Sequence, residues 1–154
     1  MNKNGNAITI LLADDDPDDR MLAKEAFVES RLRNQLEMVE DGEELMDYLN
    51  QQGKYSGANK KPKPDLILLD LNMPRKDGRE ALREIKSSPE LRRIPIVVLT
   101  TSKADEDVIR TYDLGVNSFI TKPVTFEALV EVLTTLGRYW FEIVELPPEK
   151  VAAK

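Results

Sequence analysis

Four apolar stretches of this chain end in residues that could take part in phosphoryl transfer. Asp14 and Asp15 follow the first stretch, Asp70 follows the second, Thr100 closes the third and Lys122 follows the fourth. A carboxylate can attack a phosphorus atom, while an ammonium and a hydroxyl can stabilise charge on the phosphoryl oxygens. Gathered in one place, these groups would equip an aspartate to accept a phosphoryl group.

Each group also has an ordinary explanation when it is taken alone. An acidic run before a helix, such as Asp14–Asp16, often caps that helix. A threonine at a strand end or a lysine before a proline often faces water. For Asp70 alone, chemistry and simple solvent exposure explain the residue equally well. The joint placement at successive strand ends favours chemistry over coincidence.

The composition narrows the chemistry that such a site could perform. The chain has no histidine and no cysteine, which excludes a histidine general base, a Ser-His triad, thiol catalysis, disulfides and metal sites built from either residue. A metal would be bound by oxygen, which favours Mg²⁺, with Mn²⁺ or Ca²⁺ as substitutes. Asp14, Asp15 and Asp70 would repel one another at close range, and a divalent cation would relieve that repulsion.

The apolar stretches predict a parallel sheet that brings these groups together. Runs of leucine, isoleucine and valine without polar alternation indicate strands buried on both faces. The expected strands cover 8–13, 36–39, the apolar run within 64–74 that ends at Asp70, 96–100 and 118–122. The expected helices cover 17–32, 43–51, 77–87, 105–114 and 125–144. Five strand–helix units predict a doubly wound α/β fold, in which the carboxyl ends of the strands meet at one edge.

Two finer expectations concern the first helix and the longest connection. The apolar face of the first helix is expected to consist of Met21, Leu22, Ala23, Ala26 and Phe27, with Val28 as a further candidate. The stretch 53–64 is rich in glycine, lysine, serine, asparagine and proline. This composition predicts a basic, mobile surface loop within one domain.

Length and charge suit a single cytoplasmic domain. The 154 residues are 41% hydrophobic, which is enough for one compact core. The net charge of −6 argues against nucleic-acid binding, which usually needs a basic patch. The sequence has no apolar run of the roughly 18 residues that a membrane span needs, and its start lacks the apolar region of a signal peptide. We therefore expect neither a nucleic-acid partner nor a membrane partner.

The four strand-end motifs resemble those of the response-regulator receiver domain of two-component signalling. The motifs occur in the family's order within roughly 8–136, and they are Leu11–Asp15, Leu68–Gly78, Leu99–Ser102 and Phe119–Pro123. The resemblance implies a flavodoxin-like (CheY-like) sheet of five parallel strands in the order 2-1-3-4-5, with five helices.

The resemblance also assigns roles to the acidic residues. Asp70 would be the phosphoacceptor. Mg²⁺ would bind the carboxylates of Asp15 and Asp70, the backbone carbonyl of Asn72 and, through water, Asp14. The metal would be a cofactor of the transfer.

Other residues would connect the phosphoryl group with a distant surface. Lys122 and Thr100 would contact the phosphoryl oxygens, and Thr100 would move towards them while Phe119, the switch aromatic, turns inward. The face made by the fourth helix, fifth strand and fifth helix would then change its partner preference through a population shift. The resemblance also implies a cis Lys122–Pro123 bond.

A narrower resemblance points to the stand-alone response regulators of cyanobacterial phytochromes. It rests on the basic loop, on 76–80, on 99–102 and on the ending 139–147. It implies a sensor histidine kinase, here a phytochrome, as phosphodonor. The expected organisation is a flexible N-terminus over 1–7, a receiver domain with an extended last helix over 8–146, and a polar tail over 147–154.

The end of the last helix carries more apolar residues than one five-stranded core easily buries. We expect these residues at a homodimer interface with the fourth helix, fifth strand and fifth helix, because exposed aromatic patches often mark interfaces. They are Tyr139, Trp140, Phe141, Ile143 and Val144. Packing of Trp140 and Val144 against the fourth helix or the sheet edge is the alternative.

Two other functions would use a similar fold. A phosphatase resembling the haloacid dehalogenase superfamily would also use Asp70 as nucleophile. That family needs a second aspartate as general acid where this chain has Asn72, and a cap domain is lacking. A non-phosphorylated, receiver-like binding module would not need the complete set of acceptor residues. We therefore expect a signalling phosphoacceptor, not an enzyme, whose output is contact with another protein.

Overall fold

Five parallel strands form one sheet in the order β2-β1-β3-β4-β5. The computed structural model describes residues 8–29, 34–101, 105–123 and 125–139. The strands are β1 Ile8–Ala13, β2 Asn34–Val39, β3 Leu66–Leu69, β4 Ile96–Thr100 and β5 Ser118–Thr121. The helices are α1 Pro17–Glu29, α2 Gly42–Asn50, α3 Gly78–Ser87, α4 Asp105–Asp113 and α5 Phe126–Arg138. The predicted doubly wound fold and its strand order are confirmed.

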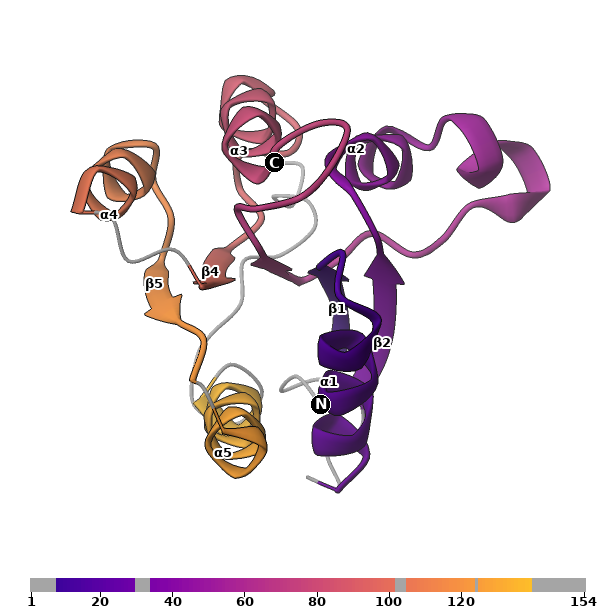
Figure 1. Ribbon diagram of the computed structural model, residues 1–154. Helices are drawn as coiled ribbons and strands as arrows, with labels where there is room; N and C mark the ends of the chain where they lie inside the picture. The colour runs from indigo at the N-terminus through magenta and orange to yellow at the C-terminus, as the bar shows by residue number, and fades with distance from the viewer. Residues whose placement is uncertain (1–7, 30–33, 102–104, 124, 140–154) are drawn as a thin grey trace, which may run out of the picture.

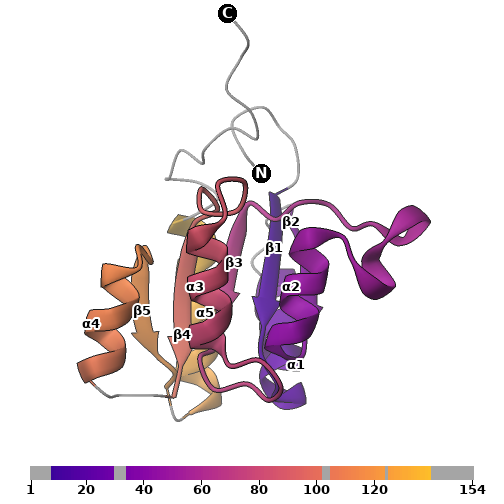
Figure 2. The ribbon, with the colours of Figure 1, turned by 90° about the horizontal axis from the view of Figure 1, so that it is seen from above.

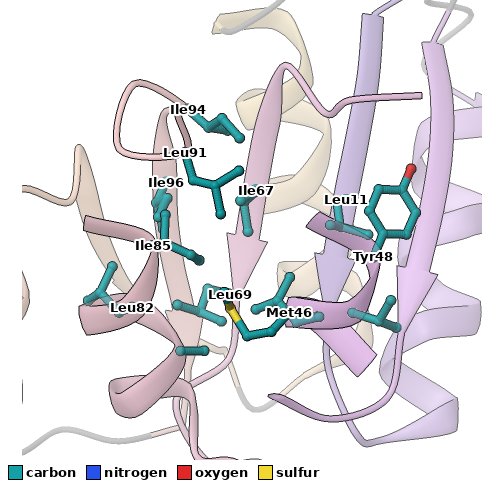
Figure 3. Close-up of a cluster of buried hydrophobic side chains, with 14 of the residues drawn as sticks. Leu11, Met46, Tyr48, Ile67, Leu69, Leu82, Ile85, Leu91, Ile94 and Ile96 are labelled. Atoms are coloured by element: carbon teal, nitrogen blue, oxygen red, sulfur yellow. The ribbon is translucent and has the colours of Figure 1, made fainter. Parts of the chain in front are cut away.

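Helices cover both faces of the sheet, which explains the uniformly apolar strands. Figure 1 shows α1 and α5 on one face and α2, α3 and α4 on the other. Successive side chains of a strand point to opposite faces. Accordingly, Ile10 and Leu12 of β1 join the core under α1 and α5, whereas Leu11 and Ala13 join the core under α2 and α3, which Figure 3 shows in close-up. Both faces therefore need apolar residues.

The acidic start of α1 is both a cap and an approach to the sheet edge. The carboxylate of Asp16 accepts a hydrogen bond from the backbone N–H of Asp18 at 2.8 Å, as expected for a residue that precedes a helix.

The expected apolar face of α1 is wrong at Met21, which is 61% exposed, while Ala23 and Phe27 are buried. A residue two positions before Ala23 lies on the opposite side of a helix, because each residue advances the chain by about 100°.

The connection from α2 to β3 is more ordered than its composition predicts. It contains two 3₁₀ turns, Gly53–Tyr55 and Gly57–Asn59, and it projects beside α2 in Figures 1 and 2. Tyr55 is buried and donates a hydrogen bond from its hydroxyl to Glu44 at 2.7 Å. Its ring packs edge-on against Tyr48, with centroids 5.1 Å apart. The predicted surface position is confirmed, since residues 53–63 are exposed apart from Tyr55, and Tyr55 anchors the segment to α2.

The structure corrects one further expectation and leaves another outside its range. The described residues contain no cis peptide bond, so the Lys122–Pro123 bond is trans. Proline lowers the cost of a cis bond but leaves trans favoured by about 0.5–1 kcal/mol. Tyr139 follows α5 and is 49% exposed. The other expected interface residues lie outside the described residues, namely Trp140, Phe141, Ile143 and Val144.

Membrane insertion finds no support in the described helices. Among residues 8–29, 34–101, 105–123 and 125–139, no helix combines the length and the apolar character that crossing a bilayer requires.

Candidate functional site

The backbone carries the functional side chains to the carboxyl edge of the sheet. Asp14 and Asp70 each follow a strand directly and keep its hydrogen bonding. The Asp14 N–H donates to Val39 O at 3.1 Å, and the Asp70 N–H donates to Ala13 O at 3.0 Å. The ladder therefore fixes Asp14 against β2 and Asp70 against β1.

Three carboxylates meet at this edge. Asp14, Asp15 and Asp70 each offer an oxygen, and these atoms all lie within 4.8 Å of one another. Asp14 and Asp70 are buried, whereas Asp15 is the exposed member of the cluster. Oxygen ligands of this kind suit a hard divalent cation. The acidic cluster is thus compatible with Mg²⁺ in its chemistry and its spacing.

Both oxygens of the Asp70 carboxylate contact donors. Oδ1 accepts a hydrogen bond from the Thr100 hydroxyl at 2.7 Å and from the Asn72 N–H at 3.1 Å. Oδ2 lies 3.3 Å from the ammonium of Lys122. Thr100 is fully buried at the end of β4, and Lys122 is held there because its N–H donates to Thr100 O at 2.8 Å. The structure therefore brings the groups that the sequence singled out around one carboxylate.

The ionisable groups of the site influence one another strongly. Burial raises the pKa of Asp14 to about 6, although hydrogen bonding and charge attraction from Lys122 oppose the rise. Burial disfavours the charge on Lys122, but hydrogen bonds to Asp14 and Asp19 outweigh it and hold the lysine pKa above its usual value. Asp14 and Lys122 lie in direct contact, with Lys122 Nζ 2.6 Å from Asp14 Oδ2.

Two residues at this edge have roles that sequence reasoning missed. Asp19 lies in the first turn of α1, where negative charge favours the helix, and its Oδ2 also lies 2.7 Å from Lys122 Nζ. Arg20 donates from Nη1 to Asp14 O at 2.8 Å and from Nη2 to Glu40 at 3.2 Å. The sequence signal for both residues was their position directly after a strand. The first turn of a helix that follows a strand faces the end of that strand.

Gly78 lets the start of α3 lie close to Asp70, the candidate phosphoacceptor. A Cβ added at Gly78 would lie 2.3 Å from Asp70 O and 2.7 Å from Leu71 Cα. The Gly78 N–H also donates to Leu71 O at 3.0 Å. Any larger residue would push the end of β3 away from α3, so this glycine maintains the position of Asp70.

Phe119 lies on β5 beside the strand that carries Thr100. The register pairs Val98 with Phe119 and Thr100 with Thr121. Phe119 is partly buried and packs against the core under α2 and α3. Its N–H donates to the hydroxyl of Tyr112 on α4 at 3.2 Å. This position joins β4, β5 and α4.

The fold and the edge cluster together define the class of protein. The response regulator receiver domain family matches residues 10–134. The chain belongs to this family, and its five-stranded sheet has the receiver order.

Two relatives make the comparison more specific. Response regulator Rcp1 of Synechocystis sp. (strain ATCC 27184 / PCC 6803 / Kazusa) is 45% identical over 138 residues, which cover 90% of this chain and 92% of Rcp1. A crystal structure of Rcp1 in its Mn²⁺-bound form superposes with a TM-score of 0.86 and covers 92% of this chain and 99% of that one. The phosphorylated cyanobacterial phytochrome response regulator RcpA is 43% identical, with a TM-score of 0.87 over 93% of this chain and all of RcpA.

Proposed function

We propose that this protein accepts a phosphoryl group on Asp70 from a phosphohistidine of a sensor histidine kinase and signals by contacts with other proteins. The observation that carries the proposal is the environment of Asp70. Its buried carboxylate lies beside a hydroxyl, an ammonium and two further carboxylates. These 154 residues include no histidine, so the donor histidine lies outside them.

In the proposed transfer, an oxygen of Asp70 attacks phosphorus and forms an acyl phosphate. The bond between phosphorus and the donor imidazole nitrogen breaks, and that nitrogen keeps the electron pair. Lys122 and Thr100, already 3.3 and 2.7 Å from Asp70, would stabilise the charge on the phosphoryl oxygens. Because the chain only receives and later loses this group, we propose a phosphoacceptor and not a turnover enzyme.

The acidic cluster would hold the divalent cation that such a transfer uses. We assign Asp15, Asp70 and the carbonyl of Asn72 as direct ligands, with Asp14 acting through water. Bound Mg²⁺ would neutralise part of the phosphoryl charge. The Mn²⁺-bound form of Rcp1 supports this assignment, because a similar chain is described with a divalent cation; Ca²⁺ is a further candidate.

A phytochrome is the kinase that the relatives favour. RcpA is described as a cyanobacterial phytochrome response regulator, and most of both chains is covered by the similarity. We therefore propose a phytochrome histidine kinase as the phosphodonor for this chain.

The proposed output runs from Thr100 to the face of α4, β5 and α5. Phe119, which contacts Tyr112 of α4 through its N–H, would respond to movement of Thr100. We propose that this face and the C-terminal extension form a homodimer. Ile109 at 61% exposed and Tyr139 at 49% support the proposal, because both are large apolar side chains open to a partner.

Mass spectrometry tests the phosphoacceptor directly. The protein is incubated with Mg²⁺ and acetyl phosphate, and its intact mass is expected to rise by one phosphoryl group. Asp70→Asn should abolish the rise, whereas Asp113→Asn, an exposed aspartate at the end of α4, should leave it unchanged. Labelling that persists in Asp70→Asn would contradict the assignment.

A further inference from the structure

Lys122 is held by a carboxylate that lies outside the acidic cluster. Its ammonium lies 2.6 Å from Asp14 Oδ2 and 2.7 Å from Asp19 Oδ2, but 3.3 Å from Asp70 Oδ2. An ammonium has three N–H donors, and these three contacts engage them all. The lysine side chain is 6% exposed, so water is a minor competitor for these donors.

Asp19 differs from Asp14 and Asp70, the other two partners of Lys122, because it is not among the candidate ligands of a cation. Asp14 and Asp70 belong to the acidic cluster with Asp15, so a bound divalent cation would draw on both. Asp19 does not belong to that cluster within the part of the chain that the structure describes. It therefore stays available to Lys122 when cation and phosphoryl group are both present.

The backbone holds Asp19 firmly beside the sheet edge. The Asp18 N–H donates to the Asp16 carboxylate at 2.8 Å, and the Arg20 N–H donates to Asp16 O at 3.1 Å. The Arg20 guanidinium in turn reaches Asp14 O at 2.8 Å. Asp19 thus sits in the first turn of α1, which the Asp16 cap closes and which the Arg20 guanidinium links to Asp14 at the end of β1.

We infer that Asp19 is a positioning residue for phosphoryl transfer, holding the Lys122 ammonium where it meets the phosphoryl oxygens. The inference rests on the proposed function. With acetyl phosphate as donor, the bond from Asp70 oxygen to phosphorus forms, the bond from phosphorus to the acetate oxygen breaks, and acetate leaves with the electron pair. Lys122 keeps its proton throughout. Without Asp19, the Lys122 ammonium would keep only Asp14 and Asp70 as carboxylate partners. The flexible lysine side chain would then move towards Asp70, the nucleophile.

The initial rate of Asp70 phosphorylation by acetyl phosphate and Mg²⁺ tests this role. Asp19→Asn is expected to lower the rate about tenfold, the low end of the effect of removing a group that orients a functional residue. Asp18→Asn is the matched control, since Asp18 is an exposed acid on the same turn, and its rate should stay within about twofold of the wild type. Loss of negative charge near an anionic donor would speed both variants, so slowing confined to Asp19→Asn reports position.

The same measurement in a Lys122→Gln background separates positioning from any other effect of Asp19. If Asp19 acts through the ammonium, Asp19→Asn should cause no further slowing once Lys122 is replaced. Equal rates for the Asp19 and Asp18 variants, a faster Asp19 variant, or the same tenfold loss in the Lys122→Gln background would each overturn the inference. These outcomes leave the proposed function intact, whereas a wild-type protein that takes up no phosphoryl group would overturn both.

Discussion

The Lys122 ammonium lies at an edge where four carboxylates gather. Asp14, Asp19 and Asp70 contact its ammonium, and Asp15 lies within the same cluster. These four carboxylates outnumber the positive groups that contact them, which are the Lys122 ammonium and the Arg20 guanidinium at Asp14 O. Such an excess is unfavourable without a counter-ion and favourable for a divalent cation. The excess of negative charge beside Asp70, the candidate nucleophile, therefore favours the binding of a cation.

Gly78→Ala should destabilise the protein by about 3 kcal/mol through overpacking. Gly78 has no left-handed backbone angle, so the cost comes from the added Cβ meeting Asp70 O at 2.3 Å. For a chain of this size the melting temperature should fall by roughly 6–12 °C. Thermal unfolding by circular dichroism measures the loss.

Gly57→Ala is the control for this prediction. Gly57 has a φ of +61° but no atom within 4 Å of an added Cβ, so it should lose about 1 kcal/mol from backbone strain alone. A smaller loss at Gly78 than at Gly57 would show that the end of β3 relaxes freely, contrary to the packing described.

At the scale of elements, the connection from β3 to α3 is fastened on both sides. Towards α2, a Cβ at Gly42 would lie 2.0 Å from Lys76 O, so helix and connection are in direct backbone contact. Towards α4, the Arg79 guanidinium donates to both oxygens of Asp107, at 2.7 and 2.6 Å. Arg79 lies in the first turn of α3, and its Nη1 also donates to Leu71 O of the connection at 3.4 Å. Arg79 therefore links the residue that precedes Asn72 to Asp107 of α4.

A double-mutant cycle on Arg79→Ala and Asp107→Asn should give a coupling energy of about 2 kcal/mol in urea unfolding. Asp107 is buried, and two parallel hydrogen bonds to a charged partner are strong. Arg79→Lys should recover little, because lysine lacks the planar fork. Arg83→Ala, one turn along α3 and exposed, should change stability by less than about 0.5 kcal/mol. Additive effects at Arg79 and Asp107 would mean that the helices are held by other contacts.

Glu44 anchors the connection between α2 and β3, and its contribution to the free energy of unfolding should depend on pH. Burial alone would raise the pKa of Glu44, but hydrogen bonds from Lys54, Tyr55 and the Glu40 N–H outweigh it and lower the pKa below its usual value of 4.5. A group whose folded pKa is lowered contributes stability above its unfolded pKa and loses it as pH falls through the folded value. The stability advantage of wild type over Glu44→Gln should therefore be full near neutral pH and shrink below about 4.5.

Urea unfolding at a series of pH values measures this advantage. Glu43→Gln is the matched control, since Glu43 is 60% exposed and its ion-pair partner Arg75 lies 3.7 Å away. Its difference from wild type should stay small at every pH. An advantage over Glu44→Gln that grows as the pH falls would reverse the sign argued from the hydrogen bonds.

At the scale of the whole molecule, short-range patterns predicted the fold and the centre of the site. Strands buried on both faces produce apolar runs, and parallel strands bring their carboxyl ends together, so Asp70 and Lys122 could be placed on one edge before their contacts were known. Asp19 and Tyr55 could not be placed, since their contacts depend on how a helix enters or how a connection folds back. Met21 was placed on the wrong face because an apolar residue type outweighed helical spacing. The trans Lys122–Pro123 bond likewise depends on surroundings that a dipeptide does not encode.

We expect the excess of negative charge to make the stability of the whole molecule depend on a divalent cation. Mg²⁺ at 100 times its dissociation constant should stabilise the folded protein by about 2.7 kcal/mol, because a ligand that binds the folded state alone shifts the unfolding equilibrium. Asp15→Asn should remove most of this gain. Asp15 is exposed and is not among the contacts of Lys122, so the variant removes a ligand and keeps the ion pairs.

The variant carries a second, opposite expectation when chelator is present. One negative charge fewer in the cluster means less repulsion, so metal-free Asp15→Asn should be at least as stable as metal-free wild type. Thermal unfolding with Mg²⁺ and with chelator measures both quantities in each protein. An equal Mg²⁺ effect in the two proteins would place the cation elsewhere, and a metal-free variant less stable than wild type would show that the Asp15 carboxylate has a stabilising contact of its own. The crossing of the two stabilities between chelator and Mg²⁺ is the result that repulsion relieved by a cation requires.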